Sequence, residues 1–144
     1  MSDELVLEGG CLCGRVRFRS LNTPVFVSHC HCQNCRRHSG ALFMTHLGLP
    51  VDGFTWLGEP PKYWRSSEAF ERGHCVECGS TVAAHYFKEP NLEVIPAGTL
   101  DDPGLVRADR HIMTESHVCW LKIEDDLPRF QRLSTQFDHL DVDL

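Results

Sequence analysis

Residues 28–43 of this 144-residue chain read SHCHCQNCRRHSGALF and place three cysteines and three histidines within eleven positions. The cysteines follow the spacing Cys30-x-Cys32-x-x-Cys35, which lets one turn of chain present three sulfur atoms. Such a stretch fits a closed structural metal knuckle, a group of redox thiols, or three ligands of a metal site that keeps one position open. The other cysteines of the chain help to distinguish these three interpretations.

Two cysteine pairs lie far from this stretch, in residues 11–13 (CLC) and residues 75–78 (CVEC). Tetrahedral zinc is commonly bound by four thiolates, and short cysteine spacings let one turn supply neighbouring ligands. Gly14 and Gly79 follow the two pairs and give the backbone the freedom to fold around a metal. We therefore predict one structural zinc that ties the two segments together, bound by Cys11, Cys13, Cys75 and Cys78.

The middle trio has no fourth cysteine at a matching distance. Three protein ligands and one open position are typical of a catalytic zinc, so we predict a catalytic zinc on Cys30, Cys32 and Cys35. Two alternatives stay open. The site is structural if a further side chain completes the tetrahedron, or the trio is a disulfide with a spare thiol. The side chains available to complete it are His29, His31, His38 and Cys119.

The charge of such a site favours a thiol as its ligand. A zinc bound by three thiolates has a net charge of about −1 and is a weak Lewis acid, which makes it a poor generator of hydroxide. Its natural fourth ligand is another soft sulfur atom, which it would bind as a thiolate. The residues alone therefore favour a small thiol substrate over metal-assisted hydrolysis.

Composition and charge limit the class of protein. Hydrophobic residues make up 42% of the chain and charged residues 24%, as in ordinary globular proteins, and the length fits one domain over residues 1–144. No run of about 18 apolar residues is present, and the N-terminus MSDELVLEGG lacks signal-peptide features, so we expect a cytoplasmic protein with no membrane partner. A net charge of −6 argues against a nucleic-acid partner. In a reducing compartment, eight cysteines are expected to be metal ligands or reactive thiols rather than disulfides.

The local patterns favour strands. Residues 15–20 (RVRFRS) alternate charged and apolar side chains, and short apolar or β-rich runs follow at residues 25–30, 41–49, 80–87 and 92–98. One helix is expected through QNCRRHS after Cys32, ended by Gly40. Asp101 and Asp102 belong to a predicted turn. We expect a mainly β fold with many short strands and little helix.

Taken together, GGCLCGRVRF, CHCQNCRRHSGALF, HCVECGS, AGTLDDP, HI and LPRF resemble the glutathione-dependent formaldehyde-activating (Gfa-like) family, whose domain also occurs in centromere protein V. The resemblance runs in order over about residues 8–130, with residues 131–144 as a C-terminal tail. It implies a zinc-containing β-tent (Mss4-like) fold with two zinc ions per chain. It also implies the same division of ligands, with the four-cysteine site structural and the trio catalytic.

The resemblance further implies carbon–sulfur lyase-type chemistry, the condensation of glutathione with formaldehyde to S-hydroxymethylglutathione. The leading hypothesis is therefore an enzyme that binds a small thiol, glutathione, at the zinc of Cys30, Cys32 and Cys35. The alternatives are a glutathione-binding carrier without turnover and a zinc-dependent interaction module. Arg36 and Arg37, which follow the trio, either bind a glutathione carboxylate or compensate the charge of the zinc site. The sequence does not specify an oligomeric state.

Overall fold

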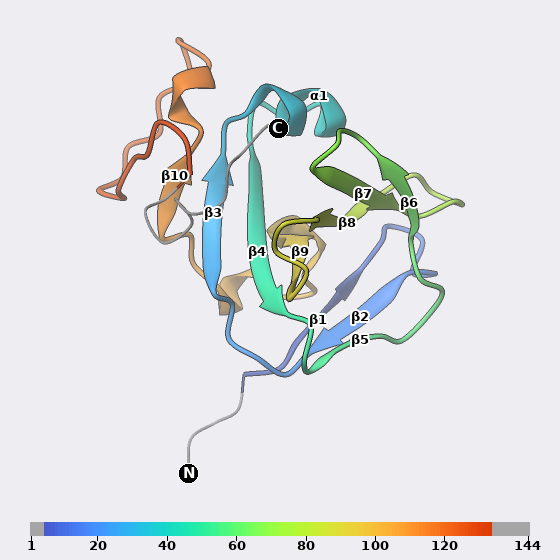
Figure 1. Ribbon diagram of the computed structural model, residues 1–144. Coiled ribbons are helices and arrows are strands. Elements are labelled where there is room, and N and C mark those ends of the chain that lie inside the picture. The colour runs from blue at the N-terminus through green and yellow to red at the C-terminus, as the bar shows by residue number, and fades with distance from the viewer. Residues whose placement is uncertain (1–4, 134–144) are drawn as a thin grey trace.

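The computed structural model describes residues 5–133 and shows a mainly β protein, as the sequence predicts. Within those residues it contains ten strands, one α-helix and three short 3₁₀ segments (Figure 1). Of the expected C-terminal tail, residues 134–144 lie outside the described residues. The elements are β1 (Leu7–Gly10), β2 (Arg17–Ser20), β3 (Phe26–Cys30), α1 (Gln33–Ser39), β4 (Met44–Pro50), β5 (Phe54–Trp56), β6 (Lys62–Arg65), β7 (Phe70–His74), β8 (Thr81–Tyr86), β9 (Leu92–Pro96), η1 (Ala97–Thr99), η2 (Pro103–Leu105), β10 (Arg110–Ile112) and η3 (Thr114–Ser116).

The strands form two sheets. A small sheet has the order β1-β2-β5, and a larger one has the order β10-β3-β4-β9-β8-β7-β6. All neighbouring strands are antiparallel except β10 and β3, which run parallel. The larger sheet is strongly twisted, and the small sheet packs beside β4 and β9 (Figure 1).

Strand alternation gives the two faces of the larger sheet different roles. On β4, Leu47 and Leu49 point to one face and are completely buried, whereas Met44 and His46 point to the other. The first face packs against the small sheet to form the main hydrophobic core. Its buried members are Leu7, Phe18, Val27, Leu47, Leu49, Ala83, Ile95, Ala97 and Leu100. The second face is left to form a cavity.

The single α-helix among the described residues follows the prediction. The Sγ atom of Cys32 caps its N-terminus by accepting a hydrogen bond from the backbone N–H of Cys35. Gly40 ends it in the left-handed conformation, at φ 75°, where glycine carries no steric penalty. Cys32 and Cys35 are therefore held on one turn. No helix among residues 5–133 has the length and apolar character to cross a membrane.

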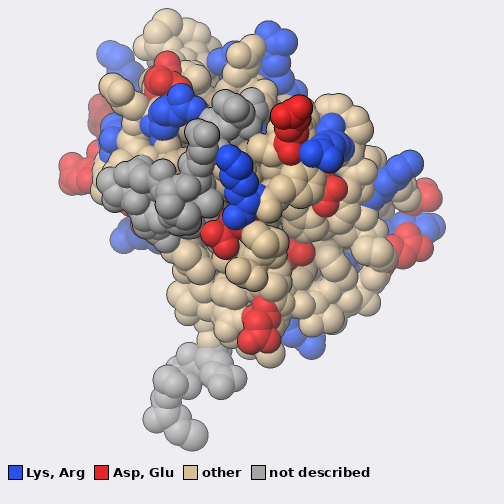
Figure 2. Space-filling model, viewed as in Figure 1, with Lys and Arg blue, Asp and Glu red and all other residues tan. Residues whose placement is uncertain are grey.

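Charged side chains of both signs are interspersed on the face of the molecule shown in Figure 2. Several of them form exposed ion pairs, including one between Arg17 and Asp101. Asp102 accepts a hydrogen bond from the backbone N–H of Gly104 and caps η2, so the turn predicted at this position is present.

Candidate metal centres

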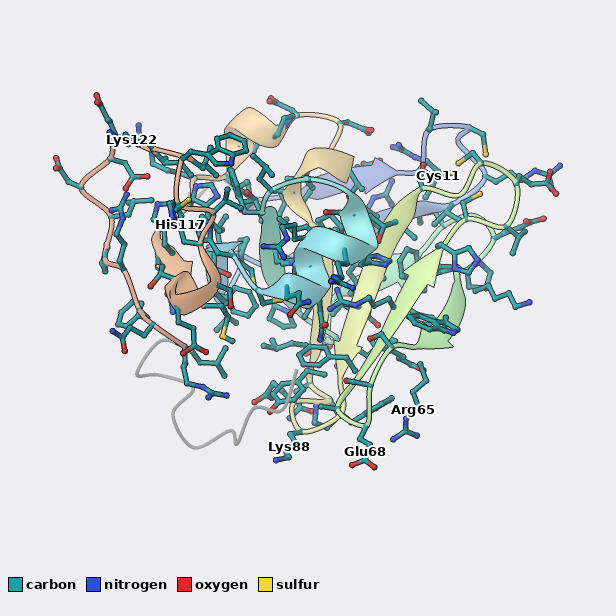
Figure 3. The ribbon with its side chains drawn as sticks, turned by 90° about the horizontal axis from the view of Figure 1, so that it is seen from above. Cys11, Arg65, Glu68, Lys88, His117 and Lys122 are labelled. Atoms are coloured by element: carbon teal, nitrogen blue, oxygen red, sulfur yellow. The ribbon has the colours of Figure 1, made fainter. Side chains whose placement is uncertain are left out.

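Four cysteines from two loops meet at one end of the molecule. Cys11 and Cys13 lie in the loop after β1, and Cys75 and Cys78 lie in the loop after β7. Their sulfur atoms all lie within 4.8 Å of one another. The Sγ of Cys13 is 3.6 Å from that of Cys11 and 3.7 Å from that of Cys75. Figure 3 shows Cys11 on the opposite side of the molecule from His117.

These distances fit a tetrahedral metal ion. Four sulfur atoms bound at about 2.3 Å to a tetrahedral zinc are about 3.8 Å from each other. Gly14 and Gly79 adopt positive φ angles of 84° and 75°, as a tight loop around a metal requires. The Ser80 hydroxyl lies 3.2 Å from the Cys78 sulfur and lowers the pKa of Cys78 to about 5. The four-cysteine set therefore forms a cluster that could hold a metal ion such as zinc.

The second cluster comprises Cys30 at the end of β3 and Cys32 and Cys35 at the start of α1. Their sulfur atoms also lie within 4.8 Å of one another, and those of Cys30 and Cys35 are 3.6 Å apart. All three residues are buried. Hydrogen bonds from Cys30 and Cys35 lower the pKa of Cys32 to about 2, and the same contacts raise the pKa of Cys30 well above its usual range. Ionising all three cysteines together would therefore require a cation beside them, which a metal ion could provide.

His46 is a neighbour of the trio that the sequence analysis does not identify. It lies on β4, and its Nε2 is 3.5 Å from the Cys35 sulfur. The group of possible metal ligands that lie within 4.8 Å of one another contains the three cysteines but not His46. Burial lowers the pKa of His46 to about 4, so the imidazole is neutral near pH 7. A neutral imidazole that donates from Nε2 to the cysteine sulfur keeps a lone pair on Nδ1.

The side chains considered as a fourth ligand lie elsewhere. His29 hydrogen-bonds to Thr45 through Nδ1, at 2.7 Å, and His38 Nε2 lies 2.6 Å from the Thr81 hydroxyl. His31 points away from the trio, as its position between two cysteines suggests, and Cys119 is exposed. None of these four side chains belongs to the trio cluster.

His31 instead joins a polar network on the other face of β3. Its Nε2 lies 2.9 Å from His111 Nδ1, and His111 Nε2 lies 2.8 Å from Asp125. The hydrogen bond from His111 lowers the pKa of Asp125 to about 2. His31 therefore belongs to a hydrogen-bonded network with His111 and Asp125 that is separate from the trio.

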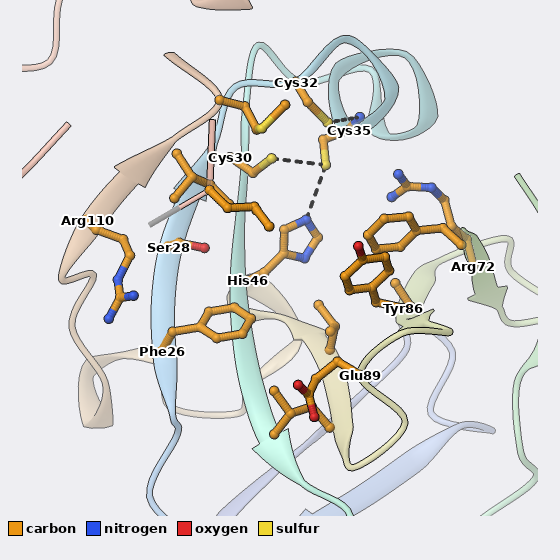
Figure 4. Close-up of a pocket in the computed structure, with 17 residues that line it drawn as sticks. Phe26, Ser28, Cys30, Cys32, Cys35, His46, Arg72, Tyr86, Glu89 and Arg110 are labelled. Carbon is orange, nitrogen blue, oxygen red and sulfur yellow. Dashed lines mark hydrogen bonds between the residues drawn. The ribbon is translucent and has the colours of Figure 1, made fainter. Parts of the chain in front are cut away.

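A cavity of about 110 Å³ is lined by all three cysteines of the trio. It lies on the face of the larger sheet opposite the core, and Figure 4 shows Ser28 and His46 on neighbouring strands within it. Arg72 of β7 also lines it and is 4% exposed, with its Nε donating to the Ser66 hydroxyl. Arg36 and Arg37 are not among the lining residues. Arg72 is the arginine of this lining whose charge helps to lower the pKa of Cys32, after the larger effect of the Cys30 hydrogen bond, and the sequence analysis does not identify it.

Comparison with known proteins shows which family the chain belongs to. Residues 6–116 match the sequence model of the family described as "Glutathione-dependent formaldehyde-activating enzyme". The chain belongs to this family. A curated relative from Halomonas elongata, named "Putative glutathione-dependent formaldehyde-activating enzyme", is 29% identical over 131 residues, which cover 83% of this chain and 82% of the relative.

A solved structure has a similar fold. The crystal structure of a Rhodobacter sphaeroides protein superimposes with a TM-score of 0.55 and 18% identity. The match covers 70% of this chain and 96% of the other. At this identity the similarity concerns the fold alone. It supports the mainly β architecture on which both cysteine clusters are built.

Proposed function

We propose that the protein adds a small thiol, glutathione, to an aldehyde at the Cys30, Cys32 and Cys35 cluster, a carbon–sulfur lyase-type reaction in the reverse direction. The observation that carries this proposal is that all three cysteines of this cluster line the cavity. None of the four cysteines of the other cluster lines it. One cluster therefore has space for a substrate beside it, and we assign the other a structural role.

The residues of the trio fit zinc. Their sulfur separation of 3.6 Å is close to the value of about 3.8 Å for tetrahedral thiolates, and three thiolates need a compensating cation. Zinc bound by these three cysteines would hold an incoming thiol as its thiolate, the nucleophilic form. The cavity lined by these cysteines leaves room for such a thiol.

The protein's own groups prepare this site in two ways. The backbone N–H of Cys35 donates to the Cys32 sulfur at 3.2 Å, which favours the thiolate and fixes its orientation. The buried guanidinium of Arg72 is a fixed positive charge on the cavity wall and lowers the pKa of Cys32, together with the larger effect of the Cys30 hydrogen bond. Arg72 is thus a candidate partner for an anionic group of the bound thiol.

The test compares adduct formation and breakdown by the zinc-loaded wild type and the Cys35→Ser variant. Glutathione and formaldehyde are mixed, and the exchange rate of S-hydroxymethylglutathione is measured by NMR against the spontaneous rate. We expect the exchange rate with the wild type to exceed the spontaneous rate, and the exchange rate with Cys35→Ser to equal the spontaneous rate. Cys119→Ser serves as the matched control, because Cys119 is exposed and outside both clusters.

The same experiment separates the alternatives. A wild type that binds glutathione but never exceeds the spontaneous rate, with binding lost in Cys35→Ser, identifies a carrier. A zinc-loaded wild type that does not bind glutathione leaves an interaction module and overturns the proposal.

A further inference from the structure

The cavity beside the trio is lined mostly by carbon. Apart from the cysteines, its wall is formed largely by apolar side chains of the larger sheet and the segment after β10. They include Phe26, Phe70, Leu92, Val94, Ile112 and Met113. Figure 4 shows the charged residues Arg72, Glu89 and Arg110 on different sides of the cavity, with His46 and Ser28 between them. The charged groups of glutathione suit only the few charged side chains of this wall, such as Arg72, so its apolar part is left for another group.

The size of the cavity does not match formaldehyde. A molecule of two heavy atoms occupies about as much space as one water, which takes up about 30 Å³ in the liquid. Formaldehyde would therefore leave most of the 110 Å³ empty. An apolar cavity of about 150 Å³ binds benzene, so this one accommodates an apolar group of roughly four to six carbons.

Two residues that line the cavity each carry a buried polar atom that has no partner among the described residues. These atoms are the Ser28 hydroxyl oxygen and His46 Nδ1. The two residues are 1% and 7% exposed, and Ser28 lies directly opposite His46 in the β3–β4 pair. Cys30 is two residues beyond Ser28 on the same strand, so it shares the same face. Buried polar atoms normally have a partner, and leaving one unsatisfied is costly.

We propose that this cavity binds the apolar body of an aldehyde larger than formaldehyde, with Ser28 and His46 bonding its oxygen. The proposal rests on the proposed function and names its substrate class. The thiol sulfur forms a bond to the carbonyl carbon, the carbonyl π bond breaks, and the thiol proton ends on the oxygen. The Ser28 hydroxyl donates to that oxygen, and His46 Nδ1 accepts from the hydroxyl of the adduct. An alcohol thus satisfies both atoms.

The first arm of the test measures substrate preference. With glutathione fixed, the acceleration over the spontaneous rate is measured for formaldehyde, butanal, hexanal and the polar glyceraldehyde. We expect acceleration to rise by about fourfold per methylene until the cavity is full, with glyceraldehyde below butanal. If every aldehyde reacts faster than the spontaneous rate but the acceleration is equal or falls from formaldehyde to hexanal, the inference is overturned and the proposed function stays intact.

The second arm does not depend on turnover. Binding of S-hexylglutathione and S-methylglutathione is measured by calorimetry. Tighter binding of the hexyl compound supports the cavity assignment even if every aldehyde reacts at the spontaneous rate, a result that sinks the proposed function alone. Equal affinities overturn the inference.

Variants identify the residues. Val94→Phe fills the cavity and is expected to lower the hexanal-to-formaldehyde ratio and the affinity for S-hexylglutathione by tenfold or more, roughly two methylenes. The same substitution at the exposed Val51 is the control. Ser28→Ala is expected to reduce acceleration with every aldehyde by about three- to tenfold while S-hexylglutathione binding is unchanged, because a thioether lacks the oxygen. A Ser28→Ala variant with wild-type acceleration removes Ser28 from the proposal.

Discussion

The Sγ atom of Cys13 lies 3.7 Å from the Sγ atom of Cys75, although 62 residues separate them in the chain. The contact joins the loop after β1, in the small sheet, to the loop after β7, in the larger sheet. A metal ion shared by these loops would fix the two sheets to each other at one end. We therefore propose that this cluster has a structural role in the packing of the two sheets.

We predict that Cys13→Ser loses the metal of the four-cysteine cluster and lowers the free energy of unfolding by several kcal/mol, because a structural zinc contributes directly to folding. The measurements are zinc content per chain and thermal unfolding. Cys119→Ser, at an exposed thiol outside the clusters, should keep both zinc ions and the wild-type unfolding temperature. A Cys13→Ser protein with two zinc ions and unchanged stability would contradict the structural assignment.

A second prediction concerns the loop that carries Cys78. Gly79 has a φ of 75°, and a Cβ there would meet no atom within 4 Å. Gly79→Ala therefore introduces conformational strain without a clash, and we expect a loss of about 1 kcal/mol in thermal unfolding. Gly98 is the matched control, because a Cβ there also meets nothing and its φ is not positive. Gly98→Ala should be neutral or slightly stabilising. Equal effects of the two substitutions would refute this explanation.

His85 gives the fold a pH dependence. It lies between Glu93 and Glu71, at 2.7 and 2.8 Å, and hydrogen bonds to Glu93 first and then Glu71 raise its pKa to about 9. A pKa raised in the folded state stabilises the fold below the unfolded value of about 6.5, and this stabilisation disappears as the pH rises to about 9.

For this partly exposed group of one histidine and two glutamates, we expect a contribution of about 1–2 kcal/mol to the free energy of unfolding after solvent screening. The measurement is urea unfolding of the wild type and His85→Gln from pH 6 to 10. The difference in free energy of unfolding should be largest at pH 6 and should shrink toward pH 9–10. A difference that is constant with pH would show that the imidazolium is not the cause.

Both cysteine clusters could be predicted from the sequence, because the spacing within each pair and within the trio is local. Cys30, Cys32 and Cys35 are close together in the chain, and the helix that contains Cys35 and is capped by Cys32 has a clear stop at Gly40. Strands with alternating or apolar residues, such as β3, β4 and β8, were also recognisable. These features depend on residues that are close together in the chain.

His46 and Arg72 could not be found in this way, because their positions depend on strand pairing. His46 meets Cys35 because β3 and β4 pair in the register that sets Ser28 opposite His46. The sequence offered one signal for His46: residues 25–30 and 41–49 are both strand-like, and pairing them as antiparallel neighbours would have placed His46 near the trio. Arg72 lies on β7, whose sequence FERGH has no apolar alternation, so neither the strand nor its inward-pointing arginine stands out.

The last prediction joins the packing of a glycine to the cavity. Gly48 of β4 lies opposite Phe26, and a Cβ there would overlap the Phe26 ring. The ring covers the cavity face of the sheet, so Gly48→Ala should push it away from the sheet and into the cavity that it lines. We expect a several-fold lower acceleration with hexanal relative to formaldehyde, measured as the ratio of the two rates.

A second substitution tests the cause. In the double variant Gly48→Ala with Phe26→Ala, the clash is gone and the cavity is larger, so the hexanal-to-formaldehyde ratio should recover to at least that of Phe26→Ala alone. This coupling between two neighbouring residues is what a double-mutant cycle measures. If Gly48→Ala lowers the ratio equally with and without the Phe26 ring, the effect does not pass through the ring. The proposed effect of the Phe26 ring on the space for hexanal is then contradicted.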